Sequence, residues 1–296
     1  MSQYDIIVLG SGPGGYVTAI RASQLGFKTA VIEKESLGGV CLNWGCIPTK
    51  ALIKSAQVFE YLQHAEDYGL TIKEYDKDFD AVVNRSRSVA ETMSKGVQFL
   101  MKKNKIDVIS GHGSLLPGKK VHVKAEDGSE QELSAQHIIV ATGARSRELP
   151  SLPQDGEKVI GYRKAMTLDK QPKKLVVVGS GAIGVEFAYF YNAMGTEVTL
   201  VEYMPRIVPV EDEEISKQME RSFKKAGINV LTNAEVTAVD TSGKGVTATV
   251  KTKKGEEEIK ADVVLSAVGI KTNIENIGLE EVGIATDRDK ILVNDY

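Results

Sequence analysis

The sequence predicts an α/β protein made of two similar three-layer domains, each with a β-meander. Three observations support this prediction. An apolar run, a glycine-rich turn, a helical pattern and a second apolar run follow one another at 4–33 and again at 174–202. The second run ends in an acid both times, Glu33 and Glu202, at the same spacing from the first glycine of the turn. Strand-like segments joined by glycine-containing turns then follow in each half, so one βαβ architecture occurs twice.

The elements of the first half follow from short stretches. YDIIVLG at 4–10 is rich in β-branched residues and predicts a strand. The turn SGPGG precedes YVTAIRASQLG, which has helical spacing, and KTAVIE predicts the next strand. The second half repeats this order with KLVVVG, SGAIG, VEFAYFYNAMG and TEVTLVE. Alternating hairpins with a closing strand are expected at 106–143 and 228–269. A helix is expected to begin near the acidic stretch at 211–214.

The overall composition excludes some partners. The chain has 296 residues and a net charge of −3, which gives no reason to expect nucleic acid or an anionic membrane. No apolar stretch is long enough to span a bilayer. The start lacks a basic region followed by a long apolar run, so no targeting signal is expected. We expect a cytoplasmic protein of bacterial origin.

The two glycine-rich turns have the pattern G-x-G-x-x-G, at 10–15 and 179–184, between a predicted strand and a predicted helix. This context is typical of Rossmann-like dinucleotide-binding domains. The first glycine makes the turn, the second lets the backbone approach a pyrophosphate, and the third lets helix pack on strand. Glu33 and Glu202 are expected to accept hydrogen bonds from ribose hydroxyls. A carboxylate at Glu202 would repel a 2′-phosphate, which favours NAD over NADP. The alternative is a turn that binds nothing.

The only two cysteines lie in an insert between Glu33 and residue 106, which has helical patterns at 50–66 and 82–103. Cys46 precedes IPTK and a helical pattern, so we expect it near a helix N-terminus, where the dipole stabilises a thiolate. Lys50 would follow one turn later. A redox-active disulfide with Cys41 is the favoured interpretation.

Three other interpretations of the cysteines remain open. A structural disulfide would close a very small loop in a reducing compartment and would stabilise little. A zinc site needs about four ligands, and the scattered histidines at 64, 112, 122 and 137 do not complete one, so no metal site is expected. Two inert buried thiols are the third possibility. The histidines are expected to be structural or exposed, and Trp44 is expected to pack beside the cysteine loop.

These motifs together resemble a known family. GSGPGG, Glu33, GGVCLNWGCIPTK, ATG at 141–143, GSGAIGVE and Glu202 resemble the pyridine nucleotide–disulfide oxidoreductases over essentially the whole chain. Within that family, CLNWGCIPTK is most similar to the dihydrolipoamide dehydrogenases. Glutathione and mercuric reductases use a related pair of cysteines, so the motif is less decisive among family members.

The resemblance implies two cofactors. FAD is expected in the first half and NAD in the second. The residues expected to bind FAD are Gly10, Gly12, Gly14, Gly15, Glu33, Lys34, Gly38, Gly39, Lys50, Gly113, Ala141, Thr142, Gly143 and Ala144. The residues expected to bind NAD are Gly179, Gly181, Ala182, Ile183, Gly184, Glu186, Glu202, Val236 and Gly269.

The resemblance also implies an activity. The expected catalytic residues are Cys41, Cys46, Lys50 and Glu186. Cys41 would exchange with the dithiol substrate, Cys46 would face the flavin as a charge-transfer thiolate, and Glu186 would pair with Lys50 near the nicotinamide. The expected reaction is oxidation of protein-bound dihydrolipoamide with NAD+ in 2-oxo acid dehydrogenase complexes. Lipoyl domains are the expected partners, and the full-length protein would be a homodimer. A different disulfide reductase and a non-catalytic nucleotide-binding fragment are the alternatives.

The expected domains are 1–148 for FAD with the redox disulfide, 149–272 for NAD, and 273–296 as a segment returning to the first domain. Family members continue into a dimerisation domain with an acid–base pair for the substrate thiols, so we expect a truncated form with impaired turnover. The stretch GIKTN at 269–273 departs from the Arg-rich, Pro-containing turn of many relatives. The contacts after Gly269 therefore stay open.

Overall fold

The computed structural model describes residues 3–295 and divides into two compact units. Unit 1 consists of Met1–Ile47, Ser88–Arg145 and Lys271–Tyr296, and unit 2 of Pro48–Arg87 and Ser146–Ile270. Residues 1–2 and 296, the outermost parts of the expected first domain and return segment, lie outside the described residues.

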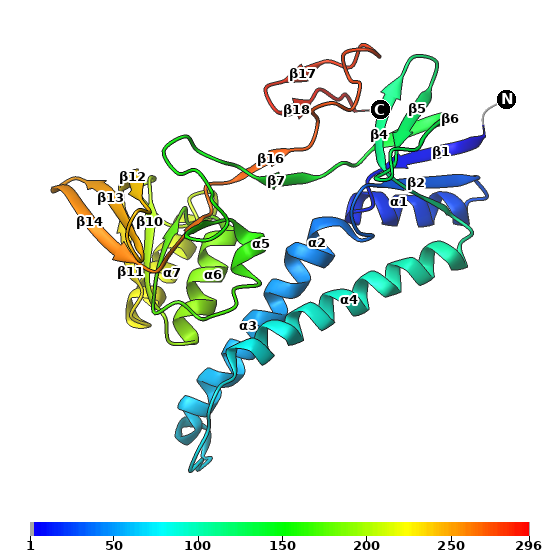
Figure 1. Cartoon of the computed structure of the whole chain (residues 1–296). Coiled ribbons are helices and arrows are strands. Elements are labelled where there is room, and N and C mark those ends of the chain that lie inside the picture. The colour runs from blue at the N-terminus through cyan, green and yellow to red at the C-terminus, as the bar shows by residue number, and fades with distance from the viewer. Residues whose placement is uncertain (1–2, 296) are drawn as a thin grey trace. The chain divides into compact units, whose positions relative to one another are not determined.

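Unit 1 is built on a six-stranded sheet with the order β3-β2-β1-β6-β5-β4 (Figure 1). Its strands and its first helix are β1 (Tyr4–Leu9), α1 (Pro13–Gln24), β2 (Thr29–Glu33), β3 (Asp107–Ser110), β4 (His112–Leu116), β5 (Lys120–Lys124) and β6 (Glu130–Val140). β1 pairs in parallel with β2 and β6, whereas β4, β5 and the start of β6 form the antiparallel meander.

The alternation of β1 places its side chains in two different layers. Ile7 and Leu9 belong to a buried cluster with meander residues such as Val121, and Val8 belongs to a second cluster with Ala19 of α1. The parallel part of the sheet therefore has a helical layer on one face and the meander on the other, which confirms the expected three-layer arrangement.

The last segment of the chain completes the meander side of unit 1. Ile277 and Leu279 are buried in the same cluster as Leu115. The Leu115 N–H donates to the Ile277 carbonyl at 2.7 Å. A Cβ on Gly278 would lie 2.2 Å from the Leu115 carbonyl oxygen, so the segment fits there only with a glycine. Two short strands follow, β17 (Thr286–Asp287) and β18 (Lys290–Ile291).

Unit 2 repeats the same plan. Its parallel sheet has the order β11-β10-β9-β15-β8, and its meander has the order β12-β13-β14. The elements from Val159 onward are β8 (Val159–Ile160), α5 (Tyr162–Ala165), β9 (Lys174–Val178), α6 (Ala182–Ala193), β10 (Glu197–Glu202), α7 (Glu213–Lys225), β11 (Asn229–Thr232), β12 (Glu235–Asp240), β13 (Val246–Thr252), β14 (Gly255–Ala261) and β15 (Val263–Ser266). Val176 and Val178 pack against the meander residues Val236 and Val250.

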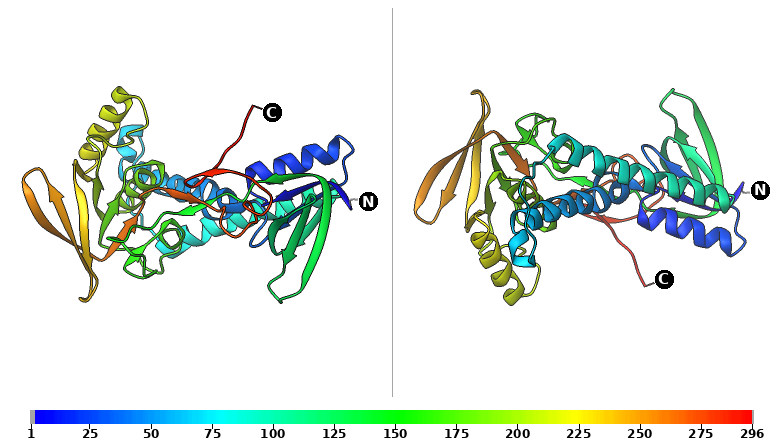
Figure 2. Two further views of the ribbon diagram at one scale, coloured as in Figure 1. Left: turned by 90° about the horizontal axis from the view of Figure 1, so that it is seen from above. Right: turned by 90° about the horizontal axis from the view of Figure 1, so that it is seen from below.

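The insert forms two long helices joined by residues 64–78, which include a short 3-10 helix, η1. Their bounds are α3 (Cys46–Gln63), η1 (Ala65–Tyr68) and α4 (Phe79–Lys103). Both views of Figure 2 show α3 beside α4. Within unit 2, Arg85 of α4 donates to the Ala51 carbonyl at 2.9 Å. Phe79 packs against Tyr191 of α6 with ring centroids 6.3 Å apart. No helix of the described residues is long and apolar enough to cross a membrane.

Some local expectations differ from the structure. A short helix, α2 (Gly39–Trp44), lies where no helix was expected. KILVND predicts a strand, but only Lys290 and Ile291 pair, and Val293 is 87% exposed. A further pair of strands, β7 (Ala144–Ser146) and β16 (Ile270–Thr272), forms a two-stranded sheet directly after Gly143 and Gly269.

Candidate functional site

The glycine-rich turn of unit 1 has a separate structural reason for each glycine. Gly10 has a φ of +95°, and a Cβ there would lie 2.3 Å from the Ala141 carbonyl oxygen. A Cβ on Gly15 would lie 2.0 Å from the Gly10 oxygen. Around Gly12 and Gly14 no atom lies within 4 Å of a built Cβ. The first and third glycines are thus required by packing, and the second leaves the N-terminus of α1 open to a ligand.

The turn of unit 2 has the same geometry. Gly179 has a φ of +97°, and a Cβ there would lie 2.4 Å from the Ala267 oxygen. A Cβ on Gly184 would lie 1.9 Å from the Gly179 oxygen, and around Gly181 nothing lies within 4 Å. Ala182 and Ile183 form the first turn of α6 directly after it. Both units therefore present an open helix N-terminus that fits an anionic ligand.

The acid at the end of each second strand folds back onto its turn. The Ser11 N–H and hydroxyl donate to Glu33 Oε2 at 2.9 and 2.6 Å. The Ser180 N–H and hydroxyl donate to Glu202 Oε2 at 2.8 and 2.6 Å. Neither serine is among the residues predicted from the sequence. The signal available was their repetition, since each follows the first glycine of its motif.

The segment after β2 packs against the first turn. Lys34 directly follows β2. The Gly38 N–H donates to the Ser11 carbonyl at 3.0 Å. Gly39 has a φ of +60°, and a Cβ there would lie 2.6 Å from the Gly12 Cα. The turn, Glu33 and the start of α2 are therefore one connected structure, and α2 continues directly to the first cysteine.

Cys41 and Cys46 form a disulfide with their Cα atoms 4.7 Å apart. Cys41 lies in α2 and is half-buried, whereas Cys46 is exposed. Cys46 is the first residue of α3, as its position before IPTK predicts. Gly45 separates the helices, and a Cβ there would lie 3.1 Å from the Val40 carbonyl oxygen.

The indole of Trp44, in the segment between the two cysteines, makes a polar contact. Its Nε1–H donates to Glu35 Oε1 at 3.1 Å, so a polar contact to the segment after β2 orients the ring. Glu35 in turn donates its N–H to Glu33 Oε1 at 2.9 Å. The cysteine loop is thereby linked to the acid of the first turn.

Lys50 and Glu186 form an ion pair within unit 2. Lys50 lies on α3, one turn after Cys46, and Glu186 lies on α6, two residues after Gly184. The Lys50 side chain is 65% exposed and that of Glu186 is 29% exposed. The structure thus brings together the two residues that the resemblance pairs.

The end of β6 lies beside the first turn. The Ala141 N–H donates to the Leu9 carbonyl at 2.8 Å, and Gly143 has a φ of +70°. Gly113 of β4 faces β1, because a Cβ there would lie 2.9 Å from Leu9 Cδ2. The Asn273 side-chain amide donates to the Thr142 carbonyl at 3.0 Å, and the Asn273 N–H donates to the Gly143 carbonyl at 2.9 Å. The segment 141–144 is thus held from both sides.

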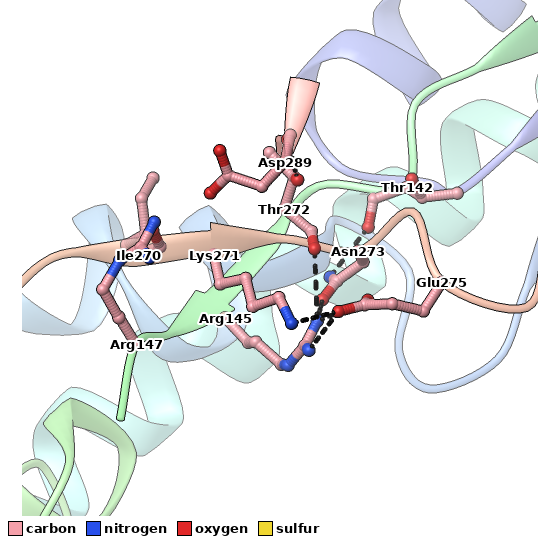
Figure 3. A network of polar contacts seen from close by, with 9 residues as sticks. All are labelled: Thr142, Arg145, Arg147, Ile270, Lys271, Thr272, Asn273, Glu275 and Asp289. Carbon is pink, nitrogen blue, oxygen red and sulfur yellow. Dashed lines mark hydrogen bonds and ion pairs between the residues drawn. The ribbon is translucent and has the colours of Figure 1, made fainter. Parts of the chain in front are cut away.

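A network of charges secures Asn273 (Figure 3). Arg145 donates to Asn273 Oδ1 at 2.9 Å and to both oxygens of Glu275 at 2.8 and 3.0 Å. Lys271 Nζ lies 2.6 Å from Glu275 Oε1. The hydrogen bonds from Arg145, which have the larger effect, and from Lys271 hold the pKa of the Glu275 carboxyl well below its ordinary value. This network forms the contacts of the segment after Gly269.

The remaining predicted residues lie apart from these contacts. Val236 is buried in the core beneath the meander of unit 2. Gly269 follows β15 with a φ of +111°, and its carbonyl accepts the Arg147 N–H at 3.0 Å. His122 lies 3.2 Å from Glu130 across a hairpin, an acid partner that its local sequence did not reveal. Among residues 3–295 no group of three His, Cys, Asp or Glu side chains is arranged to hold a metal ion.

The chain is similar to known proteins over nearly its whole length. The profile of the family described as pyridine nucleotide-disulphide oxidoreductase matches residues 4–296. A dihydrolipoyl dehydrogenase of Rhizobium etli is 49% identical, with 99% of this chain and 64% of that protein covered. Its counterpart in Zymomonas mobilis is 47% identical, with 99% and 63% covered.

A solved structure has the same fold. The crystal structure of LpdA from Mycobacterium tuberculosis matches with a TM-score of 0.88 and 31% identity, covering 96% of this chain and 63% of that one. The chain therefore spans somewhat less than two thirds of the length of these relatives. The match over residues 4–296 shows that this chain, with its two glycine-rich turns and its cysteine pair, belongs to the pyridine nucleotide-disulphide oxidoreductase family.

Proposed function

We propose that this chain contains the cofactor-binding and disulfide-bearing part of a dihydrolipoyl dehydrogenase. The observation that supports the proposal most strongly is the Cys41–Cys46 disulfide, which spans two helices next to a dinucleotide-type turn in the same unit. Relatives with this name are 41–49% identical over nearly the whole chain, which favours this branch of the family.

FAD and NAD are the proposed cofactors. The open approach at Gly12 and the carboxylate of Glu33 suit the pyrophosphate and ribose of FAD, with the segment 141–144 beside them. Gly181 and Glu202 suit NAD in the same manner. The assigned regions are 1–148 for FAD, 149–272 for NAD, and 273–296 as the returning segment. When bound, the two cofactors supply the electron and hydride transfer that protein side chains do not.

The cysteines would exchange a disulfide with the substrate. A dihydrolipoyl thiolate attacks Cys41 Sγ, the Cys41–Cys46 bond breaks, and Cys46 leaves as a thiolate. The second substrate thiolate then attacks the substrate sulfur of the mixed disulfide and releases Cys41. The substrate loses two electrons and becomes a cyclic disulfide, and the protein gains them as two thiols. The position of Cys46 at the N-terminus of α3 favours its anionic form.

Lys50 and Glu186 would together hold a positive charge close to Cys46. The carboxylate of Glu186 fixes the ammonium group of Lys50, so a cation is held one helical turn after Cys46. A fixed cation there stabilises negative charge on the thiolate or on a bound cofactor. We propose both residues as part of the active site on this basis.

Lipoyl domains of 2-oxo acid dehydrogenase complexes are the proposed partners, and a homodimer is the proposed state of the longer protein. Both proposals rest on the family branch. The assignment to this branch predicts lipoamide as the preferred disulfide over glutathione disulfide in an NADH-dependent assay.

The first experiment is the visible absorption spectrum of the purified chain before and after anaerobic addition of NADH. We expect a flavin spectrum that gains a long-wavelength band. Cys41→Ser and Cys46→Ser form a matched pair, because each removes one sulfur of the same disulfide. The band should persist in Cys41→Ser and vanish in Cys46→Ser. A flavin spectrum without any such band in the unsubstituted chain would contradict the proposed role of Cys46.

A further inference from the structure

One serine in each glycine-rich turn holds the acid of the following strand, and the geometry is the same in both units. In unit 2 the Ser180 N–H and hydroxyl both donate to Glu202 Oε2, at 2.8 and 2.6 Å. Ser180 is fully buried and Glu202 is 6% exposed. Ser11 makes the equivalent pair of bonds to Glu33. The same arrangement at the corresponding position of both turns points to a common task at the nucleotide.

The other oxygen of Glu202 is also held. Its Oε1 accepts the Met204 N–H at 2.7 Å. The Val208 N–H donates to the Ser180 carbonyl at 3.1 Å and to the Ser180 hydroxyl at 3.3 Å. Ser180 therefore joins three segments: the glycine turn, the end of β10 and the loop after it. The Glu202 carboxylate has one orientation before any nucleotide arrives.

A carboxylate fixed in this way accepts further hydrogen bonds only at the lone pairs that its protein donors leave free. A ribose hydroxyl has a proton to donate there. A 2′-phosphate dianion has no such proton and is repelled by the charge. The guanidinium of Arg206, four residues after Glu202, makes its contacts elsewhere: it donates to the Pro209 carbonyl at 3.2 Å and lies 3.7 Å from Glu213.

We propose that Ser180 is a positioning residue for the adenosine ribose of the dinucleotide, and that it sets the preference for a 2′-hydroxyl over a 2′-phosphate by fixing the Glu202 carboxylate. This inference rests on the proposed binding of NAD by unit 2. Without the Ser180 hydroxyl, Oε2 keeps only a backbone N–H donor and the carboxylate gains freedom to turn. The nucleotide then has to order the carboxylate, which lowers affinity.

The test uses Ser180→Ala with Ser216→Ala as its control. Ser216 is also fully buried, but its hydroxyl donates to the carbonyl of the same Val208, at 3.2 Å, and not to Glu202. Both variants thus lose one buried hydroxyl beside the same loop. NADH and NADPH are titrated separately into the purified chain and followed by nicotinamide fluorescence, and thermal unfolding is recorded for each variant.

We expect Ser180→Ala to weaken NADH binding by about ten-fold, the size of one hydrogen bond to a charged group, and NADPH binding by much less. Ser216→Ala should leave the ratio of the two affinities unchanged. A merely structural role would weaken both nucleotides equally, so an unchanged ratio in Ser180→Ala overturns the inference even if both affinities fall. If the unsubstituted chain binds neither nucleotide, the proposed function fails and the inference fails with it.

Discussion

The third glycine of the first turn offers a sharp test of the fold. In Gly15→Ala the new Cβ would lie 2.0 Å from the Gly10 carbonyl oxygen, whereas ordinary contacts begin at 3.4 Å. The start of α1 and the turn must therefore separate by about 1.4 Å. The partner atom belongs to the backbone, so no side-chain rotation relieves the clash.

This displacement has a cost that the structure lets us estimate. Gly10 is held by its N–H, which donates to the Ile32 carbonyl at 2.8 Å, and Gly15 by its N–H, which donates to the Gly12 carbonyl at 2.8 Å. Overpacking a well-packed site costs about 1–3 kcal/mol, and the rigid partner places Gly15→Ala near ~3 kcal/mol. For a domain of this size that is a fall in melting temperature of roughly 6 °C or more.

Gly14→Ala is the matched control. Gly14 is the neighbouring residue on the same helix, is exposed, and has no atom within 4 Å of its built Cβ. The second turn has Ile183 at the corresponding position. Alanine is a better helix former than glycine by up to about 1 kcal/mol, so this variant should melt at or slightly above the temperature of the unsubstituted chain.

The assay is thermal unfolding followed by circular dichroism at matched flavin content. Gly15→Ala should melt several degrees below the parent while Gly14→Ala does not. Equal melting temperatures for the two variants would refute the reasoning, because they would show that the turn absorbs the Cβ at no cost.

Three further changes test other contacts by the same method. Asp212→Ala removes the side chain that caps α7 by accepting two backbone N–H bonds, and should cost about 1 kcal/mol. Tyr191→Phe should lower the free energy of unfolding by ~1–3 kcal/mol, because the buried Ala165 carbonyl loses the 2.6 Å hydrogen bond from the Tyr191 hydroxyl. An unchanged stability would contradict this hydrogen bond. Arg145, and then Lys271, keep the pKa of Glu275 well below its ordinary value of 4.5. The ionised Glu275 therefore stabilises the fold above pH 4.5, and this stabilisation is lost as the pH falls and the carboxylate is protonated. In a plot of melting temperature against pH, Glu275→Gln should therefore show a smaller fall on the acid side.

The repeated strand, turn and helix could be predicted because their signals are local. Glycine alone adopts the positive φ of Gly10 and Gly179 readily, so the sequence marks these positions directly. The start of α3 at Cys46 follows in the same way from the proline two residues later. Glu33 and Glu202 could be predicted because each lies at the same distance in sequence from the first glycine of its turn.

Other features depend on contacts between distant residues and leave no local signal. Helix α2 has no helical period, and the segment that leads into it is held by residues far along the chain: the Ser94 hydroxyl donates to the Leu37 carbonyl at 2.9 Å, and the Gly38 N–H donates to the Ser11 carbonyl at 3.0 Å. Ser180 stands at a position of the glycine motif that many residue types fill, so its bond to Glu202 becomes visible only when the turn and the strand end meet.

The return of the last segment to unit 1 determines the order in which the chain can finish folding on the ribosome. Unit 2 has all of its residues once Ile270 has been synthesised. Unit 1 begins first but still lacks Ile277 and Leu279, which cover Leu115 on the meander side of its sheet. Once synthesis has passed Ile270, every residue of the second unit exists, whereas the residues that cover Leu115 on the first unit do not. Unit 1 is therefore the unit whose synthesis begins first and whose core is completed last.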